Sequence, residues 1–523
     1  MAKDATIPWM LDRTLAAHGE REGLFAATGS LTFAELYRRA LATAEVLRET
    51  GVRPGDRVGI LMEKSLEQVV AILGSLFAQA VFVPLHPTLK RDNVDHVIAD
   101  CGMAAMIADA GRVPELAGGH PALKLLVGRG EEREGLPSLP RLLAAAGSPR
   151  RFFAGAGDDA AAIIYSSGST GRPKGIVISH RNLADGARIV ASYLNTTSED
   201  RIAFLLTFNF DYGLNQLWQT LYTGASLYLH DFLFPRDGFE LLAAKRITAL
   251  PLMPVLISRL FDERFPARGR EWDFSALRYV CSTGGRVWPK MLDHLRGRFP
   301  QAEIYLMYGL TEAFRSSYLP PSELARRPTS IGKAIPEVEL HVLDEQGEIC
   351  PPHVPGELVH RGGCIAKGYW NNPQATAERF REIPRFPGER VVFSGDIVKT
   401  DEEGFLYYVS RKDAMIKSQG FRISPTEVEE IAVQQAGVSA AVAFGVLSEA
   451  AGEDVVLVYT GPEGAVPGEP DLLAALNRAL PFYMVPKRVL RMEEFPATGG
   501  GGKIDRVTVR REALRRLGLG APA

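Results

Sequence analysis

Short apolar stretches alternate with amphipathic stretches over roughly the first 310 residues of the chain. Residues 56–63 (DRVGILME) indicate a strand, 66–80 (LEQVVAILGSLFAQA) have helical spacing, and 81–87 (VFVPLHP) again indicate a strand. Strands that alternate with helices usually lie parallel in a sheet, with the helices packed on its faces. This alternation therefore predicts a layered α/β architecture with largely parallel sheets.

The pattern changes twice further along the chain. After about residue 335, apolar and polar residues alternate between glycine turns, which indicates a small antiparallel β subdomain at about 335–409. From residue 410, helical and strand-like stretches indicate a separate α+β domain. We predict an α/β protein with a large N-terminal domain, 1–409, of layered α/β subdomains plus the β subdomain, and a smaller, mobile C-terminal domain, 410–523.

Composition excludes several classes of protein. The formal net charge of −2 argues against the basic surface that nucleic-acid binding requires. The longest apolar run, 69–85, is interrupted by Gln79 and Pro84, so a buried helix followed by a strand is a better interpretation than a membrane span. The N-terminus has no apolar export signal, which argues against secretion. The cysteines form no C-x-x-C pair and no H-E-x-x-H motif occurs, which argues against a zinc site. We expect a cytoplasmic protein with no transmembrane segment, nucleic-acid partner or zinc site.

The stretch YSSGSTGRPKG, residues 165–175, follows an apolar strand and is rich in glycine, serine and threonine, with one lysine, Lys174. Glycines let the backbone approach a ligand closely, and hydroxyls with a lysine suit the oxygens of a polyphosphate. The stretch does not match the common phosphate loop G-x-x-x-x-G-K-[ST]. Taken alone, it indicates either a phosphate loop of another kind or a flexible surface turn.

Further motifs follow this loop in order: YGLTEA (308–313), GELVHRGGCIAKGYWNNPQATAERF (356–380), FSGDIV (393–398), SRKDAMIKSQGFRISPTEVE (410–429) and GKIDR (502–506). Together they resemble the motifs of the adenylate-forming superfamily of acyl-CoA synthetases, nonribosomal adenylation domains and luciferases. The segments FNFDYGLNQ, FPRDG and MYGLTEAFRSSYLPP are most similar to the AMP-forming acyl-CoA ligases that accompany exosortase A in bacteria. Free-standing amino-acid adenylation enzymes are also similar.

The resemblance implies an ATP-dependent acid–thiol ligase of the EC 6.2.1 class. Such an enzyme joins a carboxylate to the α-phosphate of ATP, releases pyrophosphate, and passes the acyl group to a thiol. Because carboxylate and phosphate are both anions, cations must offset their repulsion. The implied cofactors are ATP and Mg²⁺. The implied acceptor is CoA or a separate phosphopantetheinyl carrier protein, since no carrier-protein serine motif follows residue 506.

The resemblance also assigns roles to residues of the nucleotide site. Glu312 is implied as the Mg²⁺ ligand, Thr311 as a contact of the α-phosphate, and Lys503 as the catalytic lysine that bridges carboxylate and α-phosphate. Asp396 would accept hydrogen bonds from the ribose hydroxyls, with Arg411 as a second contact. The residues implied to bind ATP or AMP are Ser166, Ser167, Gly168, Ser169, Thr170, Gly171, Lys174, Gly284, Tyr308, Gly309, Thr311, Asp396 and Arg411.

The thiol must reach the adenylate, and the resembling enzymes rebuild the site by rotating the C-terminal domain. Asp413 matches the hinge position, and the loop around Gly420 would line the thiol tunnel. Two features depart from the family pattern. Ser410 stands where glycine is usual, and the segment from Pro496 to Lys503 is one residue longer than usual. We expect the lysine loop to be more mobile than in the family as a result.

The acid pocket begins in the segment TFNFDYGLNQ. Its pair Phe210–Asp211 matches a pair that binds the substrate ammonium in amino-acid-activating domains. Arg315 could pair with Asp211 or hold a second substrate carboxylate, because a buried carboxylate needs a cation. Either Asp211 meets the amino group of an amino acid, or it is neutralised within the protein and the substrate is a plain acyl or hydroxy acid. The candidate pocket residues are Asp211, Tyr212, Asn215, Met307, Arg315 and Ser316.

The favoured function is therefore ligation of an acyl acid or a small amino acid to a thiol. We expect the enzyme to be a monomer or a homodimer. One alternative is a ligase that charges an amino acid such as proline onto a carrier protein. Luciferase-like oxidation of the adenylate is another chemistry that the same scaffold supports. A further alternative is a non-catalytic nucleotide-binding homologue, against which stands the presence of Lys174, Glu312, Asp396, Arg411 and Lys503.

Overall fold

The computed structural model describes residues 6–116, 119, 120, 122–131, 136–145, 155–166, 173–262, 272–412, 414–418, 421–448, 452–462, 464–497 and 503–519. The chain divides into two compact units. Unit 1 comprises Met1–Leu340, His360–Val392 and Gly499–Gly501, and unit 2 comprises His341–Val359, Phe393–Thr498 and Gly502–Ala523. The boundary between residues 409 and 410 stays a prediction.

Unit 1 contains a seven-stranded sheet in the order β18-β8-β7-β4-β3-β5-β6. The strands from β7 to β6 run parallel, whereas β8 and β18 are antiparallel additions at one edge. The parallel part confirms the predicted α/β class. The bounds are β3 (Arg57–Leu61), β4 (Val81–Pro84), β5 (Ala105–Asp109), β6 (Lys124–Arg129), β7 (Ala160–Ser166), β8 (Lys174–Ser179) and β18 (Gly368–Tyr369).

A second run of paired strands in unit 1 follows the order β2-β1-β10-β9-β11-β12-β13-β14-β15. Its strands from β1 to β13 are parallel, and β2, β14 and β15 pair antiparallel to their neighbours. The carboxyl end of β13 leads directly into the YGLTEA motif. The bounds are β1 (Glu22–Ala26), β2 (Gly29–Thr32), β9 (Arg201–Phe204), β10 (Ser226–Leu229), β11 (Ala249–Leu252), β12 (Tyr279–Ser282), β13 (Glu303–Tyr308), β14 (Ser317–Leu319) and β15 (Ser330–Ala334).

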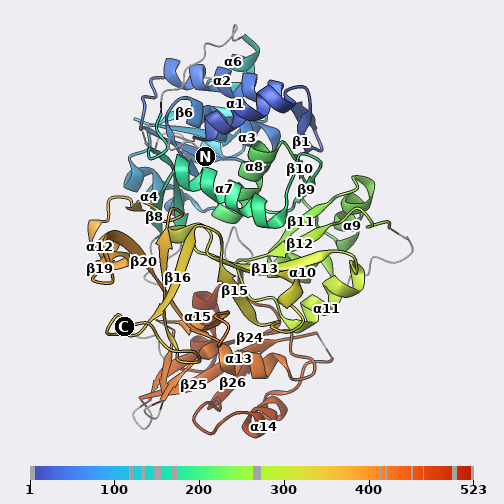
Figure 1. Ribbon diagram of the computed structural model, residues 1–523, viewed down its shortest axis with the longest axis vertical. Coiled ribbons are helices and arrows are strands. Elements are labelled where there is room, and N and C mark those ends of the chain that lie inside the picture. The colour runs from blue at the N-terminus through green and yellow to red at the C-terminus, as the bar shows by residue number, and fades with distance from the viewer. Residues whose placement is uncertain are drawn as a thin grey trace. The chain divides into compact units, whose positions relative to one another are not determined.

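Helices pack between these two sheets and share one apolar core with them. The ring of Trp218 on α8 lies 6.1 Å from the ring of Phe82 on β4. Helix α8 follows strand β9 of the second sheet, so this contact links that helix to the first sheet. Figure 1 shows α1, α2 and α3 together in blue, and α7 beside α8 in green. These helices are α1 (Ile7–His18), α2 (Phe33–Glu49), α3 (Leu66–Phe77), α7 (His180–Leu194) and α8 (Asp211–Thr223).

Smaller elements complete unit 1. They connect the strands of the two sheets and lie outside the predicted site, apart from the single turn η1. They are α4 (Arg91–Cys101), α5 (Val113–Leu116), α6 (Leu139–Ala145), α9 (Pro235–Ala244), α10 (Pro254–Leu260), α11 (Pro289–Arg298), η1 (Thr311–Ala313), η2 (Pro321–Glu323), α12 (Pro373–Arg379) and β19 (Phe380–Ile383).

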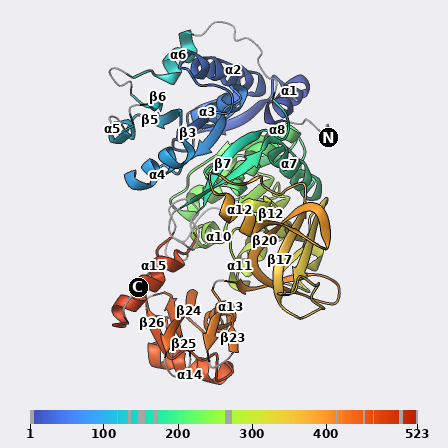
Figure 2. The same ribbon diagram turned by 90° about the vertical axis from the view of Figure 1, so that its left-hand side faces the viewer.

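Unit 2 contains a five-stranded sheet in the order β23-β22-β25-β24, with β26 parallel to β25. Figure 2 shows α13 and α14 beside this sheet. The division between the units crosses β16 (Val338–Leu343), β17 (Gly356–Gly362) and β20 (Phe386–Thr400), and β20 pairs antiparallel with β21 (Leu406–Arg411). The remaining elements are β22 (Ile416–Ser418), β23 (Phe421–Ile423), α13 (Pro425–Val433), β24 (Ala440–Ser448), β25 (Gly452–Thr460), α14 (Glu469–Ala479), β26 (Arg488–Arg491) and α15 (Arg506–Arg516).

Of the helices in the described ranges, none has the length and apolarity that crossing a membrane requires.

Candidate functional site

A lysine and a carboxylate from distant motifs meet at one tyrosine in unit 1. Lys174 begins β8 opposite Ser166, the last residue of β7. Its Nζ lies 5.6 Å from the centre of the Tyr369 ring, and the Tyr369 hydroxyl donates a 2.6 Å hydrogen bond to Oε1 of Glu312. Burial and the Glu312 carboxylate raise the pKa of Tyr369, which keeps its hydroxyl protonated as a donor. Sequence reasoning missed Tyr369, although the residue lies within the third motif.

The turn after β13 presents the predicted Mg²⁺ ligand. Thr311 and Glu312 lie in η1, and the backbone carbonyl of Glu312 accepts the N–H of Ala366 at 2.8 Å. A Cβ on Gly309 would stand 3.3 Å from Cα of Arg315, so the glycine lets the chain fold back closely on itself. The predicted Gly284 follows β12 with φ +84°, a left-handed conformation that favours glycine.

The same turn is held from α7. Phe314 has φ +42°, which is unusual for a residue with a side chain, and its ring is fully buried. A Cβ on Gly186 in α7 would lie 2.2 Å from that ring, so the missing side chain of Gly186 makes room for Phe314. The position of Phe314 in turn directs the next residue, Arg315, toward α8.

The structure brings Asp211, Tyr212 and Arg315 together. Asp211 is the first residue of α8, and its Oδ1 accepts the N–H of Tyr212 at 2.8 Å. Nη1 of Arg315 lies 4.0 Å from Oδ2 of Asp211. The guanidinium carbon of Arg315 lies 4.9 Å from the centre of the Tyr212 ring. A buried cation and a partly buried carboxylate thus lie side by side, at a separation longer than a hydrogen bond.

The other candidate pocket residues line the surroundings of this pair. The Tyr212 hydroxyl donates to the carbonyl of Cys281 at 2.9 Å, and burial raises the pKa of Cys281 to about 12. The Tyr193 hydroxyl lies 3.0 Å from Sδ of Met307. Asn215 is fully buried, and its side-chain oxygen accepts from Gln219 at 2.9 Å. The buried Ser316 donates its N–H to the carbonyl of Tyr308 at 3.2 Å.

Two predicted nucleotide contacts pair with each other in unit 2. Asp396 on β20 lies opposite Arg411 on β21, and Nη1 of Arg411 donates to Oδ1 of Asp396 at 2.9 Å. The same Nη1 donates to the carbonyl of Ser394 at 3.0 Å. Lys503 is exposed and directly precedes the bridge between Ala497 and Ile504. Ser167, Gly168, Ser169, Thr170, Gly171, Asp413 and Gly420 lie outside the described residues.

Within the described ranges, no group of three or more histidine, cysteine, aspartate or glutamate side chains is placed to hold a metal ion. A single carboxylate still suits Mg²⁺, which is commonly held by one or two carboxylates together with phosphate oxygens and waters. Glu312 fits that requirement, since Oε1 is fixed by Tyr369 and no described residue is shown to bond Oε2.

A buried histidine lies behind Tyr308, one of the residues predicted to bind ATP or AMP. The His360 ring is stacked on Tyr308, with ring centres 6.3 Å apart and an interplanar angle of 23°. Neither ring nitrogen of His360 has a hydrogen-bond partner among the described residues. Burial lowers the pKa of His360 to about 3, and burial lowers that of His180 in the same unit to about 4. Both rings are therefore neutral at pH 7.

These two histidines predict an acid-sensitive stability. Their pKa values in the folded chain lie below the ordinary 6.5, so the unfolded chain binds more protons below pH 6.5. The stability that the two neutral histidines contribute is fully present above pH 6.5. It is lost as the pH falls through about 4 for His180 and about 3 for His360. Between pH 7 and pH 5, each histidine should lower the free energy of unfolding by about 2 kcal/mol. Guanidinium chloride unfolding at both pH values checks this, and His360→Phe should remove about 2 kcal/mol of the loss. An unchanged pH dependence in His360→Phe would contradict the assignment.

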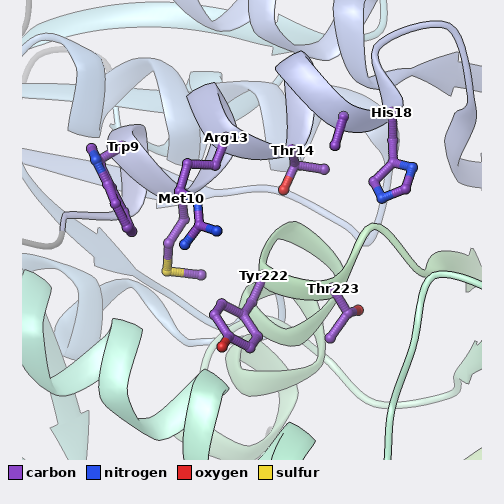
Figure 3. A pocket seen from close by; sticks show the side chains of 8 residues that line it. Trp9, Met10, Arg13, Thr14, His18, Tyr222 and Thr223 are labelled. Carbon is purple, nitrogen blue, oxygen red and sulfur yellow. The ribbon is translucent and has the colours of Figure 1, made fainter. Parts of the chain in front are cut away.

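Described residues of unit 1 line cavities at two places that bear on where the site lies. One of about 240 Å³ adjoins Lys174 and is lined by His96, Asp100, Pro173, Lys174, Gly175, Trp370, Asn371 and Asn372. The other, of about 180 Å³, lies between α1 and the end of α8 (Figure 3), where the Thr14 hydroxyl donates to the carbonyl of Leu221. Its residues Tyr222 and Thr223 lie about 17 Å along α8 from Asp211. This second cavity therefore belongs to a helix contact and not to the acid pocket.

Comparison with known proteins gives consistent matches. Residues 11–370 match the family described as AMP-binding enzyme. The chain is 32% identical over 484 residues to Gramicidin S synthase 2 of Brevibacillus brevis, a match that covers 91% of this chain and only 10% of that protein's length. The structure of ATP-bound MatB from Rhodopseudomonas palustris superposes with a TM-score of 0.88 and 27% identity, covering 98% of this chain and 99% of that one. A benzoate CoA ligase from Burkholderia xenovorans LB400 gives a TM-score of 0.85 and 26% identity, covering 97% and 99%.

Proposed function

The chain belongs to the family of AMP-binding enzymes, and from this premise we propose that it activates a carboxylic acid with ATP as an acyl adenylate and transfers the acyl group to a thiol. The observation that carries the proposal is the meeting of Lys174 and Glu312 at Tyr369. These residues come from separate motifs, and their arrangement supplies a cation and an oriented carboxylate, which suit the phosphates of a nucleotide and their Mg²⁺.

In the proposed first step, a carboxylate oxygen attacks the α-phosphate of ATP and pyrophosphate leaves. Lys174 offsets charge on the phosphates, and Thr311 contacts the α-phosphate. Glu312 would hold Mg²⁺, which when bound would neutralise part of the phosphate charge. The hydrogen bond from Tyr369 fixes the orientation of Glu312 before the nucleotide arrives, and such preorganisation supports transition-state stabilisation.

Asp396, Arg411 and Lys503 are the other proposed contacts of the nucleotide. Asp396 accepts hydrogen bonds from the ribose hydroxyls, because a carboxylate can accept several at once. Arg411 holds Asp396 in place through its 2.9 Å contact and adds a cation beside the nucleotide. Lys503 bridges the substrate carboxylate and the α-phosphate as charge develops between them.

In the proposed second step, a thiol attacks the acyl carbon and AMP leaves. The acceptor is CoA or a separate phosphopantetheinyl carrier protein. Lys503 has no part in this step, and the segment around Gly420 lines the path of the thiol after a rotation about Asp413. The CoA-ligase relative, which matches the chain over nearly its whole length, supports this two-step sequence.

Acid-dependent exchange of pyrophosphate into ATP tests the proposed function. The panel comprises short and medium acyl acids, aryl acids, dicarboxylic acids, and amino acids that include proline. We expect at least one class to support exchange well above the rate without acid, with formation of AMP once CoA or a carrier protein is added. ATP binding without exchange for any acid would contradict the proposal and favour a non-catalytic nucleotide-binding homologue.

A further inference from the structure

Arg315 is a buried cation with an unused hydrogen-bonding edge. Only 2% of its side chain is exposed. Neither Nε nor Nη2 has a hydrogen-bond partner among the residues that the structure describes. These two nitrogens form one side of the planar guanidinium, to which a carboxylate can bind through both oxygens. Because a buried charged donor without a partner is unfavourable, the free edge indicates a place for a ligand.

The other sides of the guanidinium are occupied. Nη1 faces Asp211 at 4.0 Å and lies 3.7 Å from where a Cβ on Gly309 would stand. The faces of the group lie near the rings of Tyr212 and Phe314, at 4.9 and 5.7 Å from their centres. The Nε and Nη2 edge is thus the part of the guanidinium left for a ligand.

Asp211 satisfies little of the hydrogen-bonding capacity of Arg315. At 4.0 Å the two groups attract each other without a hydrogen bond. Oδ1 of Asp211 already accepts the N–H of Tyr212 at the positive end of α8, which also stabilises its charge. Two further groups in the neighbourhood have no described partner: Nδ2 of Asn215, one helical turn after Asp211, and the hydroxyl of Ser316, the residue after Arg315. The unmet groups are therefore mainly donors, which suit an oxygen-rich ligand.

The charges rank the groups that an acid could place here. An ammonium drawn to Asp211 would enter beside the guanidinium, and the two cations would repel each other. An apolar tail would leave Nε and Nη2 buried and unpaired. A neutral amide oxygen would offer less charge to the same donors. A carboxylate would fill both donors of the edge at once with charge-assisted hydrogen bonds.

We propose that the acid activated by this site carries a second carboxylate, bound by the Nε and Nη2 edge of Arg315. The substrate is then a dicarboxylic acid, of which one end meets ATP and the other meets Arg315. This inference rests on the proposed function, since it names the substrate class of the same site.

Wild-type enzyme tests the inference without any substitution. Pyrophosphate exchange is measured with dicarboxylic acids of increasing length, with monocarboxylic acids of the same lengths, and with the corresponding half-amides and ω-amino acids. We expect kcat/KM for the best dicarboxylic acid to exceed that of its monocarboxylic acid and half-amide by about 10- to 100-fold. Equal or better exchange with monocarboxylic or amino acids overturns the inference and leaves the proposed function standing. No exchange with any acid overturns both.

Substitutions then assign the preference to Arg315. Arg315→Lys keeps the charge and removes the two-donor edge, so the dicarboxylate preference should fall at least about tenfold, mainly through KM. Asp211→Asn should keep the preference, whereas it would abolish activity if Asp211 bound an ammonium. Arg298→Lys is the matched control, since Arg298 also packs on aromatic rings but lies in α11 outside the pocket. A preference unchanged in Arg315→Lys would overturn the assignment, and circular dichroism of each variant verifies its folding.

Discussion

Replacing Lys503 by alanine is expected to lower the rate of acyl-adenylate formation by about 10²- to 10³-fold. The physical reason is the developing charge between the carboxylate and the α-phosphate, which loses its bridging cation. Thioester formation from a supplied acyl adenylate should stay within about twofold of wild type, because the proposed role of Lys503 ends with the first step. Pyrophosphate exchange measures the first half-reaction, and release of AMP from the adenylate in the presence of thiol measures the second.

Lys487→Ala is the matched control for this experiment. Lys487 is exposed in the same unit, and its backbone N–H bonds to the carbonyl of Val455 whatever its side chain is. Its replacement should change neither half-reaction. Equal loss of both half-reactions in Lys503→Ala would refute the division of labour. Unaltered exchange would refute the assignment of Lys503 altogether.

Glu312→Gln should reduce pyrophosphate exchange by about 10²-fold or more, and added Mg²⁺ should restore part of the activity. Glutamine keeps the size of the side chain and an oxygen that accepts from the Tyr369 hydroxyl. The substitution therefore removes the negative charge with little change to the packing. Exchange measured over a range of Mg²⁺ concentrations should show a raised requirement for the metal in the variant.

Glu378→Gln controls for loss of a carboxylate elsewhere in unit 1. Glu378 is exposed on α12 and accepts a hydrogen bond from Gln374 one turn earlier, at 3.2 Å. This variant should behave as wild type at every Mg²⁺ concentration. If Glu312→Gln retained exchange within about threefold of wild type, Glu312 would not be the proposed metal ligand.

Local sequence signals were sufficient for most elements. The segments predicted at 56–63, 66–80 and 81–87 correspond to β3, α3 and β4. The helix ends earlier than predicted, at Phe77, because Gln79 adopts φ +60° and turns the chain into β4. Apolar periodicity alone does not reveal such a turn, since Ala78 and Ala80 on either side of Gln79 are buried and continue the apolar pattern.

The sequence could not predict which distant segments contact one another. Tyr369 reaches Glu312 because β18 pairs with the edge strand β8. A two-residue strand is too short for its sequence to predict such a pairing. His360 lies within the third motif, but the motif assigns it no role and does not reveal that its ring is buried against Tyr308. For Arg315 the sequence left two roles open, pairing with Asp211 or holding a substrate carboxylate. The 4.0 Å separation and the unused edge favour the second.

The packing of Phe314 against Gly186 has a consequence for how this pocket could diverge or be redesigned. Gly186 on α7 makes room for the ring of Phe314, and Phe314 directly precedes Arg315 in the chain. A methyl group at position 186 would overlap the ring and force the turn, and with it the guanidinium, to move. A substitution in α7, far in the sequence from Asp211 and Arg315, could therefore change which acids the pocket accepts. Libraries aimed at new substrates should hold residue 186 as glycine while they vary the residues that face the acid.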